Sequence, residues 1–220
     1  MKNRETALLF CELPSFIELL NFTIEYSTND IKNDFIFWYP ALKTIDFIHY
    51  RINDLIKGFN YEIFSSFLSL NEEELSEVVT ETFINILSTQ KLTIFFIEEF
   101  DIINKLIYNL SFDLNYSSKK NAIEAISNAV LNSPSYLLSS FIESGCIHEL
   151  LQSLYIEDNK VLIKIIQSLD ILLYQHVLDE QKNDIIEIEF SNNFDPDCLI
   201  GIRENDDENV RLNLEKLISD

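Results

Sequence analysis

Three stretches of this chain follow one pattern: Glu-Val-Val-Thr-Glu-Thr-Phe-Ile-Asn-Ile-Leu-Ser-Thr at residues 77–89, Lys-Asn-Ala-Ile-Glu-Ala-Ile-Ser-Asn-Ala-Val-Leu-Asn at residues 120–132, and Ile-Lys-Ile-Ile-Gln-Ser-Leu-Asp-Ile-Leu-Leu-Tyr-Gln at residues 163–175. Asn85, Asn128 and Ile171 occupy the equivalent position in the three stretches and follow one another at intervals of about 43 residues. This interval lies within the roughly 40–47-residue period of two- or three-helix repeats. Such units cannot bury their apolar faces alone. They stack into a solenoid, whose extended surface usually binds another macromolecule.

The amino-acid composition favours an all-helical chain. Of the 220 residues, 47% are hydrophobic, which is enough to build a core. Only 3 glycines and 4 prolines are present, and the many turns of a β-protein require both residue types. Apolar residues recur at helical spacing, as in Ile45, Ile48, Ile52 and Ile56. We therefore predict an all-α fold, a right-handed helical solenoid of about four to five units over the whole chain.

Residues that start and end helices predict where the elements lie. Pro14 and Pro40 mark two helix starts, and Gly58 is expected to end the second of these helices, which then covers residues 40–57. Asn71, with Glu74 three positions later, has the spacing of a capping box. The further helices are expected at residues 60–69, 71–88, 91–100, 102–110, 119–131, 135–144, 147–154, 159–178, 198–203 and 209–219, in approximate units 1–57, 58–89, 90–133, 134–178 and 184–220.

The net charge of −21 limits the partners that this chain can attract. Nucleic-acid binding needs clustered Lys and Arg, so the chain would repel a phosphate backbone, and an anionic membrane surface for the same reason. A basic protein or peptide would be attracted. The same charge also keeps an ordinary protein in solution, so both interpretations stay open. The cluster Glu204, Asp206, Asp207 and Glu208 likewise fits either a partner-binding patch or a favourable helix N-terminus.

The cysteines point to a reducing compartment. Cys11, Cys146 and Cys198 are odd in number, lie far apart and form no CxxC motif, so neither a disulfide framework nor a zinc site is expected. Glu12 comes too early for the apolar core of a signal peptide. No apolar run approaches the roughly 18–20 residues of a membrane span. We expect the protein in the cytoplasm, the nucleus or both.

Residue patterns of known catalytic chemistry do not occur in the chain. It contains no glycine-rich phosphate loop, no HExxH and no GxSxG. His49, His148 and His176 lack metal-ligand spacing, and we expect each at a surface or interface. The prediction is therefore a protein without enzymatic activity, cofactor or metal.

Residues 119–173 resemble the armadillo repeats of the importin-alpha (karyopherin-alpha) family. The segment Lys119–Ala129 is similar to that family's third-helix pattern, in which Ser-Asn lies near the end. The segment Phe141–Ile147 resembles the turn between the two short helices, with its Gly-Cys-Ile. The likeness is looser over residues 60–220, and residues 194–218 resemble the closing repeat more weakly. The resemblance implies an armadillo-type solenoid and a role in protein transport or nuclear import.

In that family the third helices line a concave groove that binds an extended basic peptide. The resemblance implies that Asn side chains hold the peptide backbone, Trp side chains form slots for Lys and Arg stems, and carboxylates take the charged ends. In this chain the Asn position is held by Asn85, Asn128 and Ile171, and the Trp position by Glu81, Glu124 and Gln167.

The first unit departs further from that pattern. Trp38 is not expected to form a slot, because Pro40 would lie inside its helix and break it. An alignment of residues 44–49 with residues 80–85 places His49 at the Asn position instead.

Helical spacing predicts a polar partner-binding face. Glu77, Glu81 and Asn85 follow at i, i+4 and i+8, and Asn121, Glu124 and Asn128 at i, i+3 and i+7. Stacked repeats would join these faces into an acidic and amide ladder, although any solvated helix has such a face. The expected partner-binding residues are Glu77, Glu81, Asn85, Asn121, Glu124, Asn128 and Gln167.

Two functions therefore follow from the sequence. The first is an adaptor that resembles importin-alpha and binds a basic, extended segment of a partner in the groove. The second is an armadillo scaffold or assembly subunit that uses its convex or end surfaces, with a vestigial groove. The missing Trp positions favour the second, and neither function fixes the oligomeric state.

Overall fold

The computed structural model describes residues 7–8, 11–27, 35–52, 54–177, 188, 191–192 and 196–219, and all regular structure within these residues is helical. The chain forms two compact units, Met1–Ala125 and Ile126–Asp220. The boundary between them falls inside helix α8 (Tyr116–Asn132).

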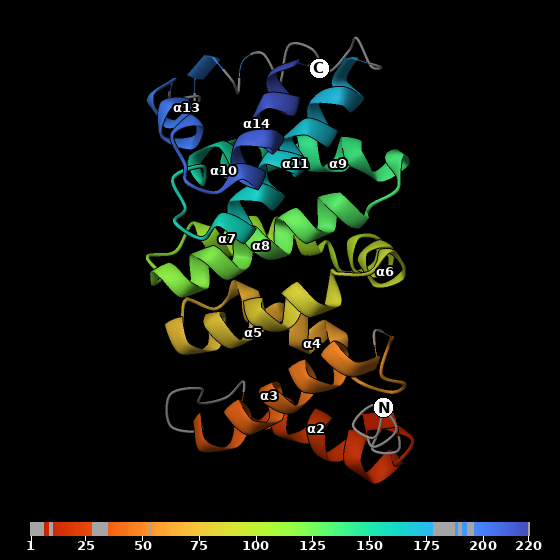
Figure 1. The fold of residues 1–220 in the computed structure, drawn as a ribbon. Coiled ribbons are helices and arrows are strands. Elements are labelled where there is room, and N and C mark those ends of the chain that lie inside the picture. The colour runs from red at the N-terminus through yellow and green to blue at the C-terminus, as the bar shows by residue number, and fades with distance from the viewer. Residues whose placement is uncertain are drawn as a thin grey trace. The chain divides into compact units, whose positions relative to one another are not determined.

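The first unit stacks its helices in chain order (Figure 1). Helix α2 packs on α3, α3 packs on α5, and η1 packs on α5 and α7. Besides the first part of α8, the elements of this unit are α2 (Pro14–Ser27), α3 (Phe35–Ile52), α4 (Tyr61–Ser66), η1 (Phe67–Ser69), α5 (Glu73–Ile86), α6 (Gln90–Phe100) and α7 (Ile102–Leu110).

The second unit repeats the arrangement of two short helices followed by a longer one. Helix α10 packs on α9 and α11, and α14 packs on α11 and α13. Besides the last part of α8, its elements are η2 (Ser135–Leu137), α9 (Leu138–Glu143), α10 (Cys146–Gln152), α11 (Asn159–Val177), α13 (Pro196–Arg203) and α14 (Glu208–Ser219).

Aromatic side chains fill the core of the first unit. The rings of Phe83 and Phe96 lie 5.5 Å apart between centroids, those of Phe64 and Phe83 5.2 Å, and those of Tyr61 and Phe96 5.2 Å. The rings of Phe64, Phe83 and Phe96 are fully buried. These contacts join α4, α5 and α6, so the aromatic residues that recur at helical spacing form a packed core.

A left-handed backbone position recurs once per repeat. Gly58 has φ +79°, Asp101 has φ +51° and Gly145 has φ +82°. Each precedes a short helix, α4, α7 or α10, whereas the long third helix follows later. Glycine adopts this conformation without strain, and Asp tolerates it better than most residues. Asp101 lies between the short helices α6 and α7 and Gly145 between α9 and α10, whereas Gly58 lies between α3 and α4.

The boundaries of α3 differ from those that the prolines and glycines predicted. The helix runs from Phe35 to Ile52 with Pro40 inside it, instead of from 40 to 57. The sixth residue of a helix would donate only one intrahelical bond, to the carbonyl of Ile36, so Pro40 removes a single bond. Gly58 lies six residues beyond the helix end and three residues before α4, which corrects its assignment as the C-terminal cap of α3.

Two further local predictions were wrong. Helix α5 has Glu72 at its N-cap with no side-chain cap bond, so Asn71 and Glu74 form no capping box. His49 is fully buried rather than at a surface. The other predicted helices agree with the observed ones to within a few residues.

Candidate functional site

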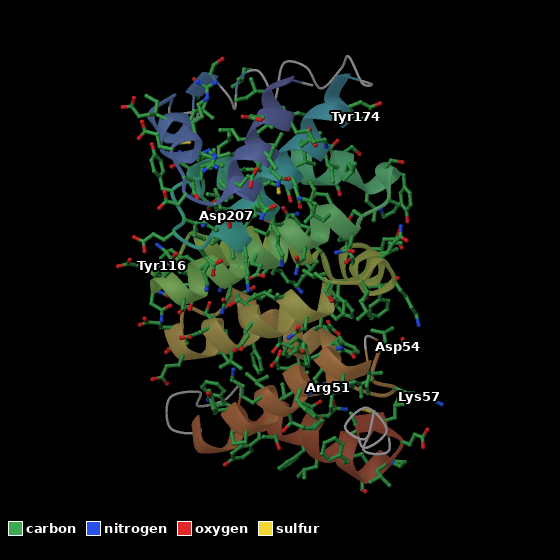
Figure 2. The ribbon with its side chains drawn as sticks, viewed as in Figure 1. Arg51, Asp54, Lys57, Tyr116, Tyr174 and Asp207 are labelled. Atoms are coloured by element: carbon green, nitrogen blue, oxygen red, sulfur yellow. The ribbon has the colours of Figure 1, made fainter. Side chains whose placement is uncertain are left out.

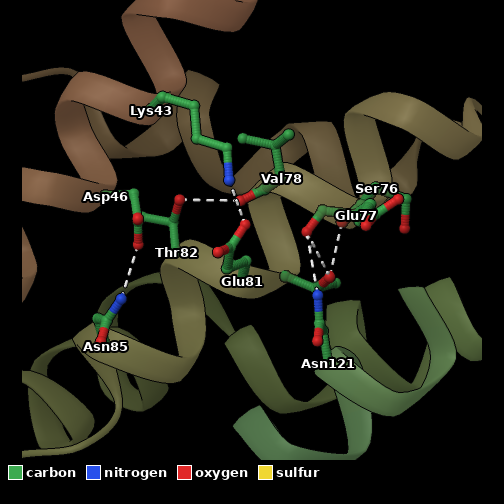
Figure 3. A network of polar contacts seen from close by, with 10 residues as sticks. Lys43, Asp46, Ser76, Glu77, Val78, Glu81, Thr82, Asn85 and Asn121 are labelled. Carbon is green, nitrogen blue, oxygen red and sulfur yellow. Dashed lines mark hydrogen bonds and ion pairs between the residues drawn. The ribbon is translucent and has the colours of Figure 1, made fainter. Parts of the chain in front are cut away.

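Polar side chains connect consecutive third helices of the first unit (Figure 3). The amide nitrogen Nδ2 of Asn85 on α5 donates to Oδ1 of Asp46 on α3 at 2.7 Å. One turn earlier on both helices, the ammonium of Lys43 forms an ion pair with Glu81. The two contacts join residues 39 and 38 positions apart, so each spans about one repeat. We call Lys43, Asp46, Glu81 and Asn85 the polar ladder.

The polar face continues from α5 to the first part of α8. Nδ2 of Asn121 donates to the backbone carbonyl of Glu77 at 3.4 Å, and Nδ2 of Asn115 lies 3.5 Å from Oε2 of the same residue. Figure 3 shows Glu77 and Asn121 facing one another beside the polar ladder. The part of the predicted face that lies in the first unit is therefore one connected surface over α3, α5 and α8.

Charge and burial act against each other on the polar ladder. Burial works to lower the pKa of Lys43, but the hydrogen bond and the charge of Glu81 outweigh it, so this pKa lies above its ordinary value. Burial raises the pKa of Asp46, and the bond from Asn85 only partly offsets this effect. A cation placed beside Asp46 would favour its ionised form.

The second unit contains equivalent contacts between α11 and α14. Nε2 of Gln167 donates to Oδ1 of Asn213 at 2.9 Å, and one turn later Lys216 pairs with Asp170 at 2.5 Å. Both contacts span 46 residues. The same kind of polar link between third helices therefore occurs in each unit.

The predicted partner-binding residues occupy different environments. Glu77, Glu81 and Asn85 on α5, and Asn121 and Glu124 on α8, are all half-buried, as is Gln167 on α11. Asn128 is only 6% exposed, so its side chain offers little surface to a partner.

The first unit presents neither a tryptophan slot nor a histidine on this face. Trp38 is 2% exposed and lies in the core, inside an intact helix rather than excluded from one by Pro40. His49 does not take the Asn position, since its Nε2 lies 3.2 Å from the Tyr61 hydroxyl inside the core.

Sequence reasoning missed several residues of the polar ladder and of the equivalent contacts in the second unit. Lys43, Asp46, Asp170, Asn213 and Lys216 were not among the candidates, although each contacts a residue of a neighbouring third helix. A search for complementary polar pairs one repeat apart would have found them.

The described residues contain neither a cluster suited to a metal ion nor a helix suited to spanning a membrane. No group of three or more His, Cys, Asp or Glu side chains there has the arrangement of a metal site. No helix among those residues is both long and apolar enough to cross a membrane.

Comparison with known proteins identifies the fold. The chain matches an engineered protein with a TM-score of 0.66 and 14% sequence identity, over 99% of this chain and 87% of that one. It also matches a designed armadillo repeat protein solved in complex with the peptide (KR)4, with a TM-score of 0.60, 15% identity and coverage of 94% and 98%. A second designed armadillo repeat protein gives a TM-score of 0.59 at 15% identity, with coverage of 91% and 98%. The fold is an all-α, armadillo-type helical solenoid.

Sequence comparison adds no family to this structural result. No family model matches the chain, and no curated protein matches it.

Proposed function

We propose that this protein is a non-enzymatic adaptor that binds a basic, extended segment of a partner protein on the polar face of its third helices. The observation that carries the proposal is the polar ladder, in which complementary side chains align over one repeat between α3 and α5. That alignment gives successive carboxylates and amides a regular spacing, as an extended peptide requires. The (KR)4 peptide in the designed neighbour is in line with this partner chemistry.

The ladder also sets the mechanism of binding. Glu81 is already paired with Lys43, and Asp46 already accepts from Asn85, so an arriving Lys or Arg must displace or share these bonds. Exchange of one ion pair for another costs little when both lie at a partly exposed surface. Asn85 would then be released to hold the peptide backbone through its donor and acceptor.

Calorimetric titration with a Lys/Arg-rich bipartite peptide, at low and at physiological salt, tests the proposal. We expect binding that survives physiological salt and is lost in the Glu81→Lys/Glu124→Lys variant. The matched control is Glu99→Lys/Glu157→Lys, which changes the net charge equally at exposed positions of the same chain. Equal weakening by both double variants would show that only the overall charge matters and would overturn the proposal.

A second function has its own supporting observation. Leu19, Phe22 and Tyr26 follow at i, i+3 and i+7 on α2 and are 60%, 64% and 53% exposed. An exposed apolar stripe of this kind suits an assembly subunit that uses an end surface. Sedimentation velocity of the wild-type chain and of Phe22→Asp distinguishes the two functions, because only the assembly subunit would form an oligomer that this substitution dissociates.

The resemblance to importin-alpha extends the first proposal to nuclear protein import, with the protein in the cytoplasm and nucleus. The test is import of a fluorescent cargo that carries a basic signal into the nuclei of permeabilised cells. Nuclear accumulation that depends on this protein, and that is lost with Glu81→Lys/Glu124→Lys, would support the extension. Peptide binding without import would leave the adaptor function and remove the transport role.

A further inference from the structure

Arg51, near the end of α3, is held by two aromatic rings. Its guanidinium carbon lies 4.9 Å from the ring centroid of Tyr50 and 5.5 Å from that of Phe47. Both rings reach the solvent, with Tyr50 58% and Phe47 42% exposed. Two ring faces at these distances attract the positive charge of the guanidinium and cover part of it from water.

Among the described residues, no acceptor is bonded to this guanidinium. Its Nε is enclosed and has no hydrogen-bond partner. Within the part of the chain that the structure describes, the guanidinium makes no ion pair, although the chain has 37 Asp and Glu residues. Because Nε is enclosed, an arriving oxyanion would bind the terminal nitrogens of the guanidinium. It would gain contacts there that the described residues do not supply.

The neighbouring carboxylates are already occupied. Asp46 accepts from Asn85, and Asp54, in the turn after α3, pairs with Lys91 at 2.6 Å. Figure 2 shows Arg51, Asp54 and Lys57 in this order along the end of α3 and the following turn. Lys57, later in the same turn, is exposed and adds a second positive charge to this stretch of chain.

We propose that Arg51, Phe47 and Tyr50 form a carboxylate-binding site, which takes an Asp or Glu side chain of a partner protein. The rings have already removed water from one side of the guanidinium, so a carboxylate loses less hydration on binding and meets a charge in a lower dielectric. A planar guanidinium donates to both oxygens of a carboxylate at once. This proposal does not rest on peptide binding to the polar ladder.

Two properties favour a carboxylate over a phosphate group. The net charge of −21 penalises an arriving dianion more than a monoanion. One arginine supplies one paired contact, which a single carboxylate satisfies, whereas phosphate sites gather several donors.

Nuclear magnetic resonance of the arginine Nε–H groups tests the site directly, because the chain has only four arginines. The probes are the blocked tripeptide acetyl-Gly-Glu-Gly-amide, its Gln counterpart, and inorganic phosphate, each titrated at constant ionic strength. Arg51→Lys assigns the Arg51 resonance by its disappearance. We expect a saturable shift of Arg51 with the Glu peptide and none with the Gln peptide. Arg203, exposed on α13, is the internal control.

Variants that remove one aromatic ring test whether the rings contribute to binding, or whether the charge of Arg51 alone is enough. Phe47→Leu and Tyr50→Leu retain Arg51 and should each weaken Glu-peptide binding by about twofold to fivefold, as the loss of one cation–π contact predicts. A shift of Arg51 no larger than that of Arg203, or an equal response to the Gln peptide, would overturn the proposal. Tighter binding of phosphate than of the Glu peptide would overturn its assignment to carboxylate.

Discussion

At the scale of single residues, His49 couples the first unit to pH. Its ring is fully buried beside Tyr61, and burial lowers its pKa from 6.5 to about 4. The unfolded chain protonates His49 below about pH 6.5, whereas the folded chain keeps it neutral down to about pH 4. The contribution of His49 to the free energy of unfolding is therefore at its full value above pH 6.5. It falls as the pH decreases toward 4 and changes little below that.

We expect this group to remove about 3 kcal/mol of unfolding free energy between pH 7 and pH 4. The measurement is urea unfolding at several pH values for the wild-type chain and for His49→Gln, which keeps a polar group beside Tyr61 but does not titrate. The wild-type curve should drop more steeply than that of the variant. Raised carboxyl pKa values, such as that of Asp46, act in the opposite direction in both proteins and cancel in the comparison. Parallel curves would show that His49 is not the group responsible.

Asn109 on α7 contributes to stability through two buried hydrogen bonds. Its Nδ2 donates to the carbonyl of Leu68, and its Oδ1 accepts from the Ser76 hydroxyl, both at 2.9 Å. Asn109→Ala leaves both partners buried without a bond and should cost about 2–4 kcal/mol in urea unfolding. The control is Asn104→Ala on the exposed side of the same helix, which should cost less than about 1 kcal/mol. Similar losses in both variants would contradict the role of the buried bonds, because Ala has the higher helix propensity and cannot itself cause a loss.

At the scale of elements, we expect the substitution of glycine by alanine to have opposite effects on stability at two positions. Gly145 lies between α9 and α10 at φ +82°, and Gly201 lies inside α13 in ordinary helical conformation. A Cβ at either place meets no atom within 4 Å, so backbone conformation alone decides the outcome. Gly145→Ala should destabilise by about 1–2 kcal/mol, and Gly201→Ala should stabilise by up to about 1 kcal/mol. Thermal unfolding of both variants measures the two changes in stability. Two changes of the same sign would contradict the view that backbone conformation decides the outcome.

Helices and their order were predictable because apolar spacing and helix propensity are local. Helix α6, predicted at 91–100, runs from Gln90 to Phe100, and α7 has its predicted bounds. The start of α3 was not predictable from Pro40, because burial of Trp38 outweighs the loss of one hydrogen bond. The pairing of Asp46 with Asn85 depends on the register between two helices, which the spacing within either helix does not contain.

At the scale of the whole molecule, the excess of negative charge opposes folding. The 37 acidic side chains repel one another most strongly in the compact state. The pairs Lys43–Glu81, Lys91–Asp54 and Lys216–Asp170 are partly exposed and offset little of this repulsion. Screening that repulsion should stabilise the chain by about 1–2 kcal/mol between low salt and roughly 0.5 M sodium chloride. The measurement is urea unfolding at each salt concentration, repeated with potassium chloride. A loss of stability with salt would mean that attractive pairs outweigh the repulsion.

The hydrogen bonds that connect the repeats also bear on how the chain folds. Within the first unit, the bonds Ser76–Asn109, Asn85–Asp46 and Asn121–Glu77 join residues 33, 39 and 44 positions apart. In the second unit, Gln167–Asn213 joins residues 46 positions apart. The entropy of loop closure grows only slowly with length, so each of these links closes at a similar cost. Links of about one repeat in length permit folding that spreads from one repeat to the next, beginning while the chain is still being synthesised.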